Sequence, residues 1–467
     1  MIRFAIAFFS YVALSGIYAV QQVASSLGAP KRLVRPKNPA PPGDEALVPD
    51  NLTDRIHLRG RRLLLRCGDP AIVCFLAIEE LLSKGFGYVR DVAAARFDRV
   101  GRLPGRVYRQ IWYALVALGA ESRVTVRQAK NTRYIFVLVR NNPEMLNLPQ
   151  AGKLELLTYL DRAYEIGEFE SIWSVEGLGH VFTQRTWSLD WGASTDARGI
   201  LTDGQAMDLP DKSLTMMHAG LGLAFAEGLL KQLAPKSSPA EAERVVALFL
   251  RLCRANSRPG YVGCALESLG LVTRCFNYPL VPQVSAALSK LDRSALEYFW
   301  RGAGRAIYFS PAHLLPPLSC PWSAAEQEAP DGRVLEIMKA GLAWPASLVN
   351  MRTPEIFERF LLRHARDPAN ERAIFHGVAA STVMAIDIAP GSSTVERYVR
   401  HEPISRDVRL EDRWRRLVRD PIEAAVHRYH PLLRRHEKID EIFRFQDLEI
   451  LTQRLEASPA TAQFDRT

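Results

Sequence analysis

The chain contains 467 residues, of which 48% are hydrophobic and 24% are charged. A chain of this length exceeds one average domain, and this composition is typical of folded proteins, which excludes a protein that is disordered throughout. The formal net charge of +9 is unevenly distributed. Residues 54–144 carry 17 Lys and Arg against 8 Asp and Glu. This stretch alone accounts for the positive excess, and the remainder of the chain is balanced.

The amino-terminal residues form an apolar run followed by a spacer. Residues 4–20 are uncharged and long enough for a short transmembrane helix, so we predict a membrane anchor or signal segment at 1–29. A signal peptide cleaved near residues 23–26 is the alternative, and the body would then be exported. Residues 30–50 hold six prolines and are typical of an extended tether. Basic residues in this tether favour an anchored protein with a cytoplasmic body.

Residues 51–145 have the pattern of a small basic module. Three amphipathic stretches, beginning near residue 69, are followed by alternating apolar runs at 122–128 and 133–139, which predict a β-hairpin. Three helices and a two-stranded ribbon resemble a winged helix, in which the third helix enters the major groove of DNA. We therefore predict a winged-helix-like α+β module here.

The basic residues of this module are candidates for contacts with nucleic acid or an anionic surface. Arg106 and Arg109 lie on the expected third helix, and Arg127, Lys130 and Arg133 lie on the expected ribbon. Winged helices also dock other proteins, and a basic module tethered to a bilayer faces anionic lipid. We expect a membrane and a protein as partners, and keep nucleic acid as the less favoured alternative.

Clusters of glycine and alanine recur through the middle of the chain. Their leading glycines are 43, 43, 39, 39 and 36 residues apart, which indicates an internal repeat. A glycine inside a helix costs about 1 kcal/mol relative to alanine, so its recurrence requires a compensating contact. The leading glycines are Gly177, Gly220, Gly263, Gly302, Gly341 and Gly377.

Amphipathic segments separate these clusters, for example residues 240–253, 283–291 and 353–365. Each unit is therefore predicted to be a helical hairpin whose glycine face lets a neighbouring helix come close. We predict a mainly α fold of stacked hairpins over residues 150–395, in the form of an α-solenoid or a toroid. Charged helices at 396–455 and a disordered tail at 456–467 complete the chain.

The clusters Glu-Gly-Leu-Gly, Ala-Gly-Leu-Gly-Leu-Ala-Phe and Gly-Val-Ala-Ala-Ser, with the element Arg-Ala-Ile-Tyr-Phe at 305–309, carry a family resemblance. They resemble a glycine-repeat domain of unknown function encoded beside enediyne polyketide biosynthesis genes, the enediyne biosynthesis protein family. The resemblance covers about residues 150–385. The segment after Gly263, the amino-terminal anchor and the basic module depart from the family pattern. Because the family has no established reaction, the resemblance implies only an association with natural-product biosynthesis.

Polar side chains flank several clusters, and Arg301 and Arg305 are the most informative of them. They are four residues apart on one helix face, where like charges repel unless an acid or an anion joins them. A ligand held in a cleft between glycine-lined helices would meet such side chains. The candidates for ligand contact are His180, His218, Arg301, Arg305 and His376.

Motifs that would specify an enzyme class are missing from the sequence. It contains no HExxH, GxSxG, Walker or CxxCH motif. The cysteines at positions 67, 74, 253, 264, 275 and 320 lack zinc-type spacing, which favours free thiols. The histidines within residues 427–436 have basic neighbours, so we expect no metal there. We predict no cofactor and lean toward a protein without catalytic activity.

Three functions fit these observations. The first is a membrane-tethered helical-repeat scaffold or accessory protein that supports natural-product or lipid-like biosynthesis. The second is an enzyme that binds an apolar substrate in a glycine-lined cleft between helices. The third is a membrane-anchored regulator that binds DNA through the basic module.

Overall fold

The computed structural model describes most of the chain beyond residue 141. It covers 142–191, 194–309, 321–365, 367–403 and 408–457, together with residue 128 and much of 131–140. Most of these residues are helical and none forms a strand, which confirms the prediction of a mainly α fold. The chain divides into two units, residues 1–130 with 310–323, and residues 131–309 with 324–467. We call the described part of the second unit the helical body.

All six predicted glycine clusters lie in helices, which we call the glycine helices. They are α8 (Glu168–Trp191), α9 (Asp211–Leu230), α11 (Val262–Phe276), α13 (Arg293–Phe309), α15 (Gly332–Leu348) and α17 (Glu371–Ile388).

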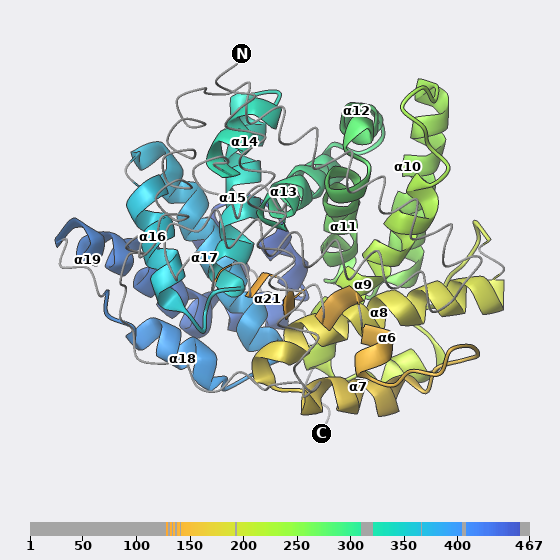
Figure 1. Cartoon of the computed structure of the whole chain (residues 1–467), viewed down its shortest axis with the longest axis horizontal. Helices are drawn as coiled ribbons and strands as arrows, with labels where there is room; N and C mark the ends of the chain where they lie inside the picture. Colours follow the sequence, from red (N-terminus) through yellow and green to blue (C-terminus); the bar gives the residue numbers. More distant parts are fainter. Residues whose placement is uncertain are drawn as a thin grey trace, which may run out of the picture. The chain divides into compact units, whose positions relative to one another are not determined.

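Each glycine helix packs against the next in this order (Figure 1). The last helix, α17, also contacts α8 and α9. At that contact Thr215 Oγ1 on α9 donates a hydrogen bond of 2.6 Å to Asp387 on α17. The series of glycine helices therefore returns to its start.

Pairs of glycines two residues apart let one helix pack closely on two sides. Residues two apart on an α-helix point in nearly opposite directions, because each residue turns the helix by about 100°. A Cβ at Gly220 would lie 2.3 Å from the carbonyl oxygen of Glu176 on α8. A Cβ at Gly222 would lie 2.1 Å from the carbonyl oxygen of Ala265 on α11. The first glycine thus faces the preceding helix, and the second faces the following one.

Helix α13 repeats this arrangement. A Cβ at Gly302 would lie 2.1 Å from the carbonyl oxygen of Glu267 on α11, and one at Gly304 would lie 2.1 Å from that of Met338 on α15. Both distances are too short for a real side chain, so the helix backbones themselves are in contact. At these positions of the helical body, the glycine faces are filled by neighbouring helices.

From α9 onward, a further helix lies between each glycine helix and the next in the chain. Helix α10 begins with a capping box, in which Glu241 N donates to Ser238 Oγ and Ser238 N donates to the Glu241 carboxylate. Between α8 and α9, the described residues form only a short 3-10 helix, Gly204–Asp208. We call these further helices the covering helices, and they are α10 (Pro239–Asn256), α12 (Val281–Leu291), α14 (Pro321–Glu328) and α16 (Pro354–His364).

The prediction of a β-strand at residues 133–139, the second strand of the expected hairpin, is wrong. The described residues of 133–139 are helical, and a short helix α6 (Asn142–Met145) follows. Ile135, Leu138 and Asn142 are all buried at helical spacing, and Asn142 Nδ2 donates to the carbonyl oxygen of Ser174 on α8. A Cβ at Gly177 would lie 2.6 Å from the Val139 carbonyl oxygen. Packing against α8 therefore overrides the β preference of this apolar run.

Helix α7 (Leu156–Glu165) packs against α8 near the start of the body. The helices that follow α17 are α18 (Ser393–Arg400), α19 (Val408–Trp414), α20 (Asp420–Ala424), α21 (His430–Arg435) and α22 (Leu448–Ala457). We call residues 393–457 the C-terminal segment.

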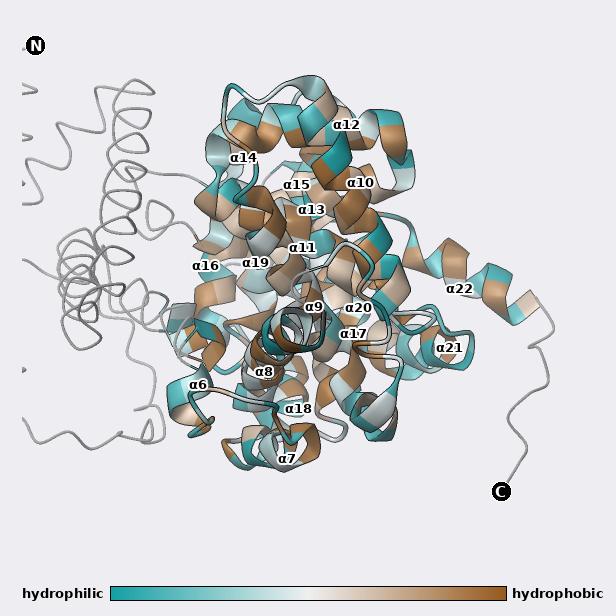
Figure 2. Cartoon of the chain, turned by 90° about the vertical axis from the view of Figure 1, so that its right-hand side faces the viewer, coloured by the Kyte–Doolittle hydropathy of each residue, from teal (hydrophilic) through white to brown (hydrophobic). Residues whose placement is uncertain are grey.

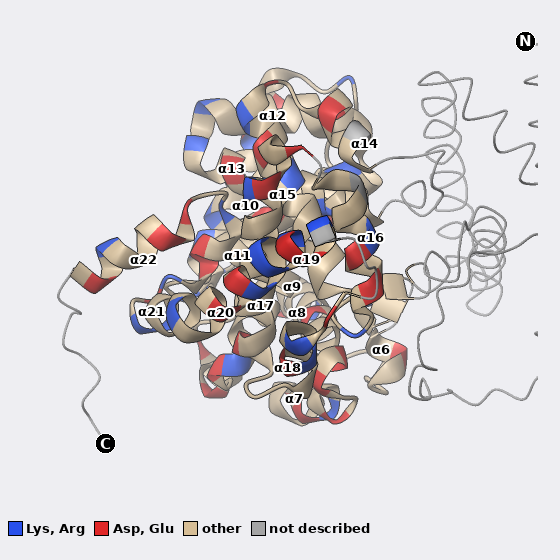
Figure 3. Ribbon diagram, turned by 90° about the vertical axis from the view of Figure 1, so that its left-hand side faces the viewer, with Lys and Arg blue, Asp and Glu red and all other residues tan. Residues whose placement is uncertain are grey.

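The C-terminal segment packs apolar side chains such as Trp414, Leu417 and Ile422 inward, while hydrophobic residues gather in the interior of the body (Figure 2). Its outer surface mixes basic and acidic residues, and α22 extends away from the other helices (Figure 3).

Only α9, among the described helices, is long and apolar enough to cross a membrane. Its most apolar window is 89% buried inside the body, as expected of a core helix. The predicted anchor at 1–29, the tether at 30–50 and nearly all of the tail at 456–467 lie outside the described residues. The same holds for most of the module at 51–145, including Arg106, Arg109, Arg127, Lys130 and Arg133.

Candidate functional site

Four charged side chains from three glycine helices meet inside the helical body. Arg305 on α13 donates at 2.9 Å to Glu176 on α8 and at 2.9 Å to Glu267 on α11. Arg301, one turn earlier on α13, donates at 3.2 Å to the other oxygen of Glu267. The two arginines are therefore joined by an acid, which is the condition that their spacing required. We call these four residues the charge network.

The charge network is almost completely buried. Its side chains are at most 2% exposed, and two positive and two negative charges balance. Trp344 on α15 lies against both guanidinium groups, with its ring centroid 5.5 Å from Arg301 Cζ and 4.8 Å from Arg305 Cζ. A substitution that removes one charged side chain from such a network would leave a buried charge without its partner, and this strongly destabilises the fold.

The pKa values of the network follow from burial and pairing. Burial raises the pKa of the Glu176 carboxyl, against the lowering effect of Arg305. Burial alone would lower the pKa of Arg305, but the carboxylates of Glu176 and Glu267 raise it. Both pKa values are therefore raised, which disfavours the charged form of Glu176 and favours the charged form of Arg305, because Arg305 has two carboxylates to stabilise it. Since arginine keeps its proton in proteins, we treat the pair as ionised at neutral pH.

Arg301 and His376 lie at the end of the network that faces the C-terminal segment. Arg301 Cζ is 5.0 Å from the ring centroid of Phe443, and the His376 ring packs edge-on against Phe445. Burial lowers the pKa of Arg301 to about 10. Burial and the charge of Arg301 lower the pKa of His376 to about 3, so its imidazole is neutral. Within the described residues, neither ring nitrogen of His376 has a hydrogen bond of normal geometry, although a backbone contact to Arg444 opposes the lowering of its pKa.

The other two predicted histidines lie elsewhere. His218 is fully buried, with Nδ1 2.7 Å from the Leu214 carbonyl oxygen, while Nε2 accepts a hydrogen bond of 3.0 Å from the Arg258 N–H. Both ring nitrogens are thus satisfied by backbone groups, and burial lowers the pKa of His218 to about 4. His180 lies 3.4 Å from Glu227, which also pairs with Arg140 at 2.7 Å.

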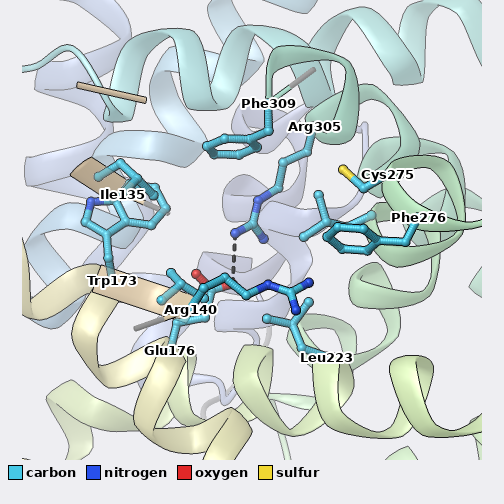
Figure 4. A pocket seen from close by; sticks show the side chains of 11 residues that line it. Ile135, Arg140, Trp173, Glu176, Leu223, Cys275, Phe276, Arg305 and Phe309 are labelled. Carbon is cyan, nitrogen blue, oxygen red and sulfur yellow. Dashed lines mark hydrogen bonds and ion pairs between the residues drawn. The ribbon is translucent and has the colours of Figure 1, made fainter. Parts of the chain in front are cut away.

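A pocket of about 60 Å³ opens beside the charge network (Figure 4). It lies between Ile135, Val139 and Arg140 on one side and α8, α9, α11 and α13 on the others. Arg305 and Glu176 are at its buried end, and its walls are mostly apolar. Arg140 and Phe276 form its solvent-facing rim, where the guanidinium carbon of Arg140 stacks 4.5 Å from the centroid of the Phe276 ring. The walls include Ile135, Val139, Trp173, Leu223, Leu271 and Phe309.

The structure brings together only some of the predicted ligand-contact residues. Arg301 and Arg305 share the charge network and His376 lies near them, but Arg305 alone lines the pocket. Sequence reasoning missed Glu267 as a network member and Arg140 and Cys275 as pocket residues. The arginine spacing signalled that an acid was needed without specifying which one. Among the described residues, no group of three or more His, Cys, Asp or Glu side chains is placed to hold a metal ion.

Comparisons with known proteins give no relative. No protein-family model matches the chain, and neither a curated protein nor a solved structure is significantly similar to it.

Proposed function

We propose that this protein is a membrane-tethered helical-repeat scaffold or accessory protein. In this proposal, each glycine helix with its covering helix is one copy of a repeated unit, and the units close into a toroid-like body. The amino-terminal segment holds this body at a membrane, where it positions other proteins of a natural-product or lipid-like biosynthetic system.

The observation that supports this proposal is the way the interior is filled. Backbones meet backbones at Gly220, Gly222, Gly302 and Gly304, and the charge network is buried and internally paired. A body packed in this way is rigid and offers its outer surface for binding. An enzyme with a glycine-lined cleft would need these faces open, and at these positions they are occupied.

The link to natural-product biosynthesis comes from the resemblance of residues 150–385 to the enediyne biosynthesis protein family. It stays a prediction, as does binding of DNA by the basic module. The identity of the neighbouring genes is the most direct test of the pathway. Genes for polyketide or lipid assembly would support the link, and their absence would contradict it.

A localisation and cross-linking experiment tests the scaffold itself. The full chain and a chain lacking residues 1–29 are expressed in the native host, each with a photo-crosslinking amino acid at Met207 or Leu189, which are exposed on the body. The full chain is expected in the membrane fraction with a reproducible cross-linked protein, and the shortened chain in the supernatant without it. A full chain found in the supernatant, or equal cross-linking by both chains, would contradict the proposal.

A second candidate function is binding of a small apolar ligand. The pocket beside Arg305 favours it, because most of its walls are apolar and its rim is open to solvent.

A further inference from the structure

We propose that the pocket beside the charge network binds an unbranched medium-chain carboxylate, with the hydrocarbon end inside and the carboxylate at Arg140. The inference rests on the proposed function only in its choice of an acyl chain, the kind of intermediate that polyketide and lipid assembly share. The pocket and its charges are features of the body in their own right.

The size of the pocket limits what can enter it. Its volume of about 60 Å³ is less than half of the ~150 Å³ of an apolar cavity that holds benzene. A ring therefore does not fit, and of a linear chain only the last few carbons are enclosed, while the rest of the chain lies at the open rim beside Arg140. The apolar walls, including Ile135, Leu223 and Phe309, favour a hydrocarbon over a polar group, since a polar group would lose its hydrogen bonds to water there.

The charges of the pocket set the direction in which a chain enters. At the buried end, Arg305 is already paired with Glu176 and Glu267 at 2.9 Å, so it does not attract a further anion. At the rim, Arg140 is 37% exposed and is the remaining cation of the lining. An anionic head group is therefore expected at Arg140, with the hydrocarbon pointing toward Arg305.

Arg140 can exchange its present carboxylate partner for that of a ligand, because this partner has other support. Glu227 is joined to Arg140 at 2.7 Å. Burial alone would raise the pKa of Glu227, but His180, Arg140 and Lys231 lower it to about 2, so Arg140 is not the sole group that stabilises this anion. Glu227 still has His180 within 3.4 Å when a ligand carboxylate takes its place at Arg140. The guanidinium group is held over the pocket mouth by stacking on Phe276, at 4.5 Å. Recognition of a ligand carboxylate therefore exchanges one anion for another at a fixed arginine.

The test compares octanoate with octan-1-ol, two ligands with the same chain and different head groups. The full chain is reconstituted in lipid nanodiscs, and binding is measured by calorimetry with empty nanodiscs subtracted. We expect octanoate to bind at least fivefold more tightly than octanol. Arg140→Gln should remove this preference and leave octanol binding unchanged. The matched control Arg244→Gln, at an exposed residue of α10 outside the pocket, should change neither.

A second variant and a second readout locate the ligand. Leu271→Phe adds bulk to the pocket from a half-buried position, so it should weaken both ligands at least tenfold. Alkylation of Cys275, which lines the pocket, is followed by peptide mass spectrometry and should slow when octanoate binds. Thermal unfolding of each variant confirms that it is folded.

Three results of the binding measurements would overturn the proposal. They are no octanoate binding to the wild-type chain, equal binding of octanoate and octanol, and octanoate binding that Arg140→Gln leaves intact. Complete protection of Cys275 in nanodiscs before ligand is added would assign the pocket to bilayer lipid and would also overturn it. None of these results bears on membrane tethering or cross-linking, so failure here leaves the scaffold proposal standing.

Discussion

The centre of the helical body and the C-terminal segment are held together by different means. In the centre, glycine helices touch through their backbones, as at Gly302 and Glu267, with carbonyl groups where side chains would otherwise stand. The C-terminal segment is attached by side chains, including Arg416 on Glu371 and Arg444 on Glu297. Where backbones touch, a single added side chain is enough to disturb the packing of two helices. Where side chains make the attachment, the stabilising free energy is divided among many separate contacts, so the loss of one contact costs less.

The largest effect is expected where charge is buried in the centre. Arg305→Met removes the partner of Glu176 and Glu267 and should lower the free energy of unfolding by about 3–5 kcal/mol. Arg254→Met, which breaks an ion pair with Asp292 at an arginine that is 51% exposed, should cost about 0–1 kcal/mol. Urea denaturation of both variants measures the difference. Equal losses would show that the charge network is not buried as described.

An intermediate effect is expected at a buried attachment of the C-terminal segment. Asp387 is buried and accepts hydrogen bonds from Thr215, and it pairs with His430 at 3.1 Å and Arg434 at 3.2 Å. Asp387→Asn should cost about 2 kcal/mol, because contacts to a charged acceptor are lost.

The control for this change is Asp412→Asn, which removes an exposed carboxylate of the same segment and should change stability by less than about 0.5 kcal/mol. Urea denaturation compares the two. Limited proteolysis should also release the C-terminal segment earlier in Asp387→Asn, and an unchanged cleavage order would argue against this attachment.

The third effect is acid sensitivity of the centre, which is small near neutral pH and grows as the pH falls. Burial lowers the pKa values of His218 and His376 to about 4 and about 3, whereas a histidine in the unfolded chain has a pKa of about 6.5. At a pH below about 6.5, the unfolded chain therefore binds more protons than the folded chain does. Stability should therefore fall as the pH drops from about 6.5 to 4, by up to about 1.4 kcal/mol per pH unit for each histidine.

Replacing one buried histidine isolates its share of this dependence. His376→Leu should flatten the fall in stability, measured by urea denaturation at pH 4 to 7, whereas His427→Leu, at an exposed position, should not. A wild-type stability that does not change over this range would mean that these histidines are accessible to protons in the folded state.

The same contrast explains what could be predicted from the sequence. The glycine helices were predictable, because each recurring glycine carries a cost that only a close contact offsets. The run at 133–139 was misassigned, since a short apolar stretch fits strand and helix periodicity alike and its packing on α8 decides between them. The pocket was not predictable, because Arg140, Leu223, Cys275 and Phe309 come from segments far apart in sequence.

A paired alanine substitution tests most directly whether the glycine faces are filled by neighbouring backbone. A Cβ at Gly302 would lie 2.1 Å from the Glu267 carbonyl oxygen, whereas one at Gly332, at the start of α15, meets nothing within 4 Å.

In urea denaturation, Gly302→Ala should lose about 2 kcal/mol despite the better helix propensity of alanine, and Gly332→Ala should be as stable as the wild type or more so. Equal stability of the two variants would contradict the account.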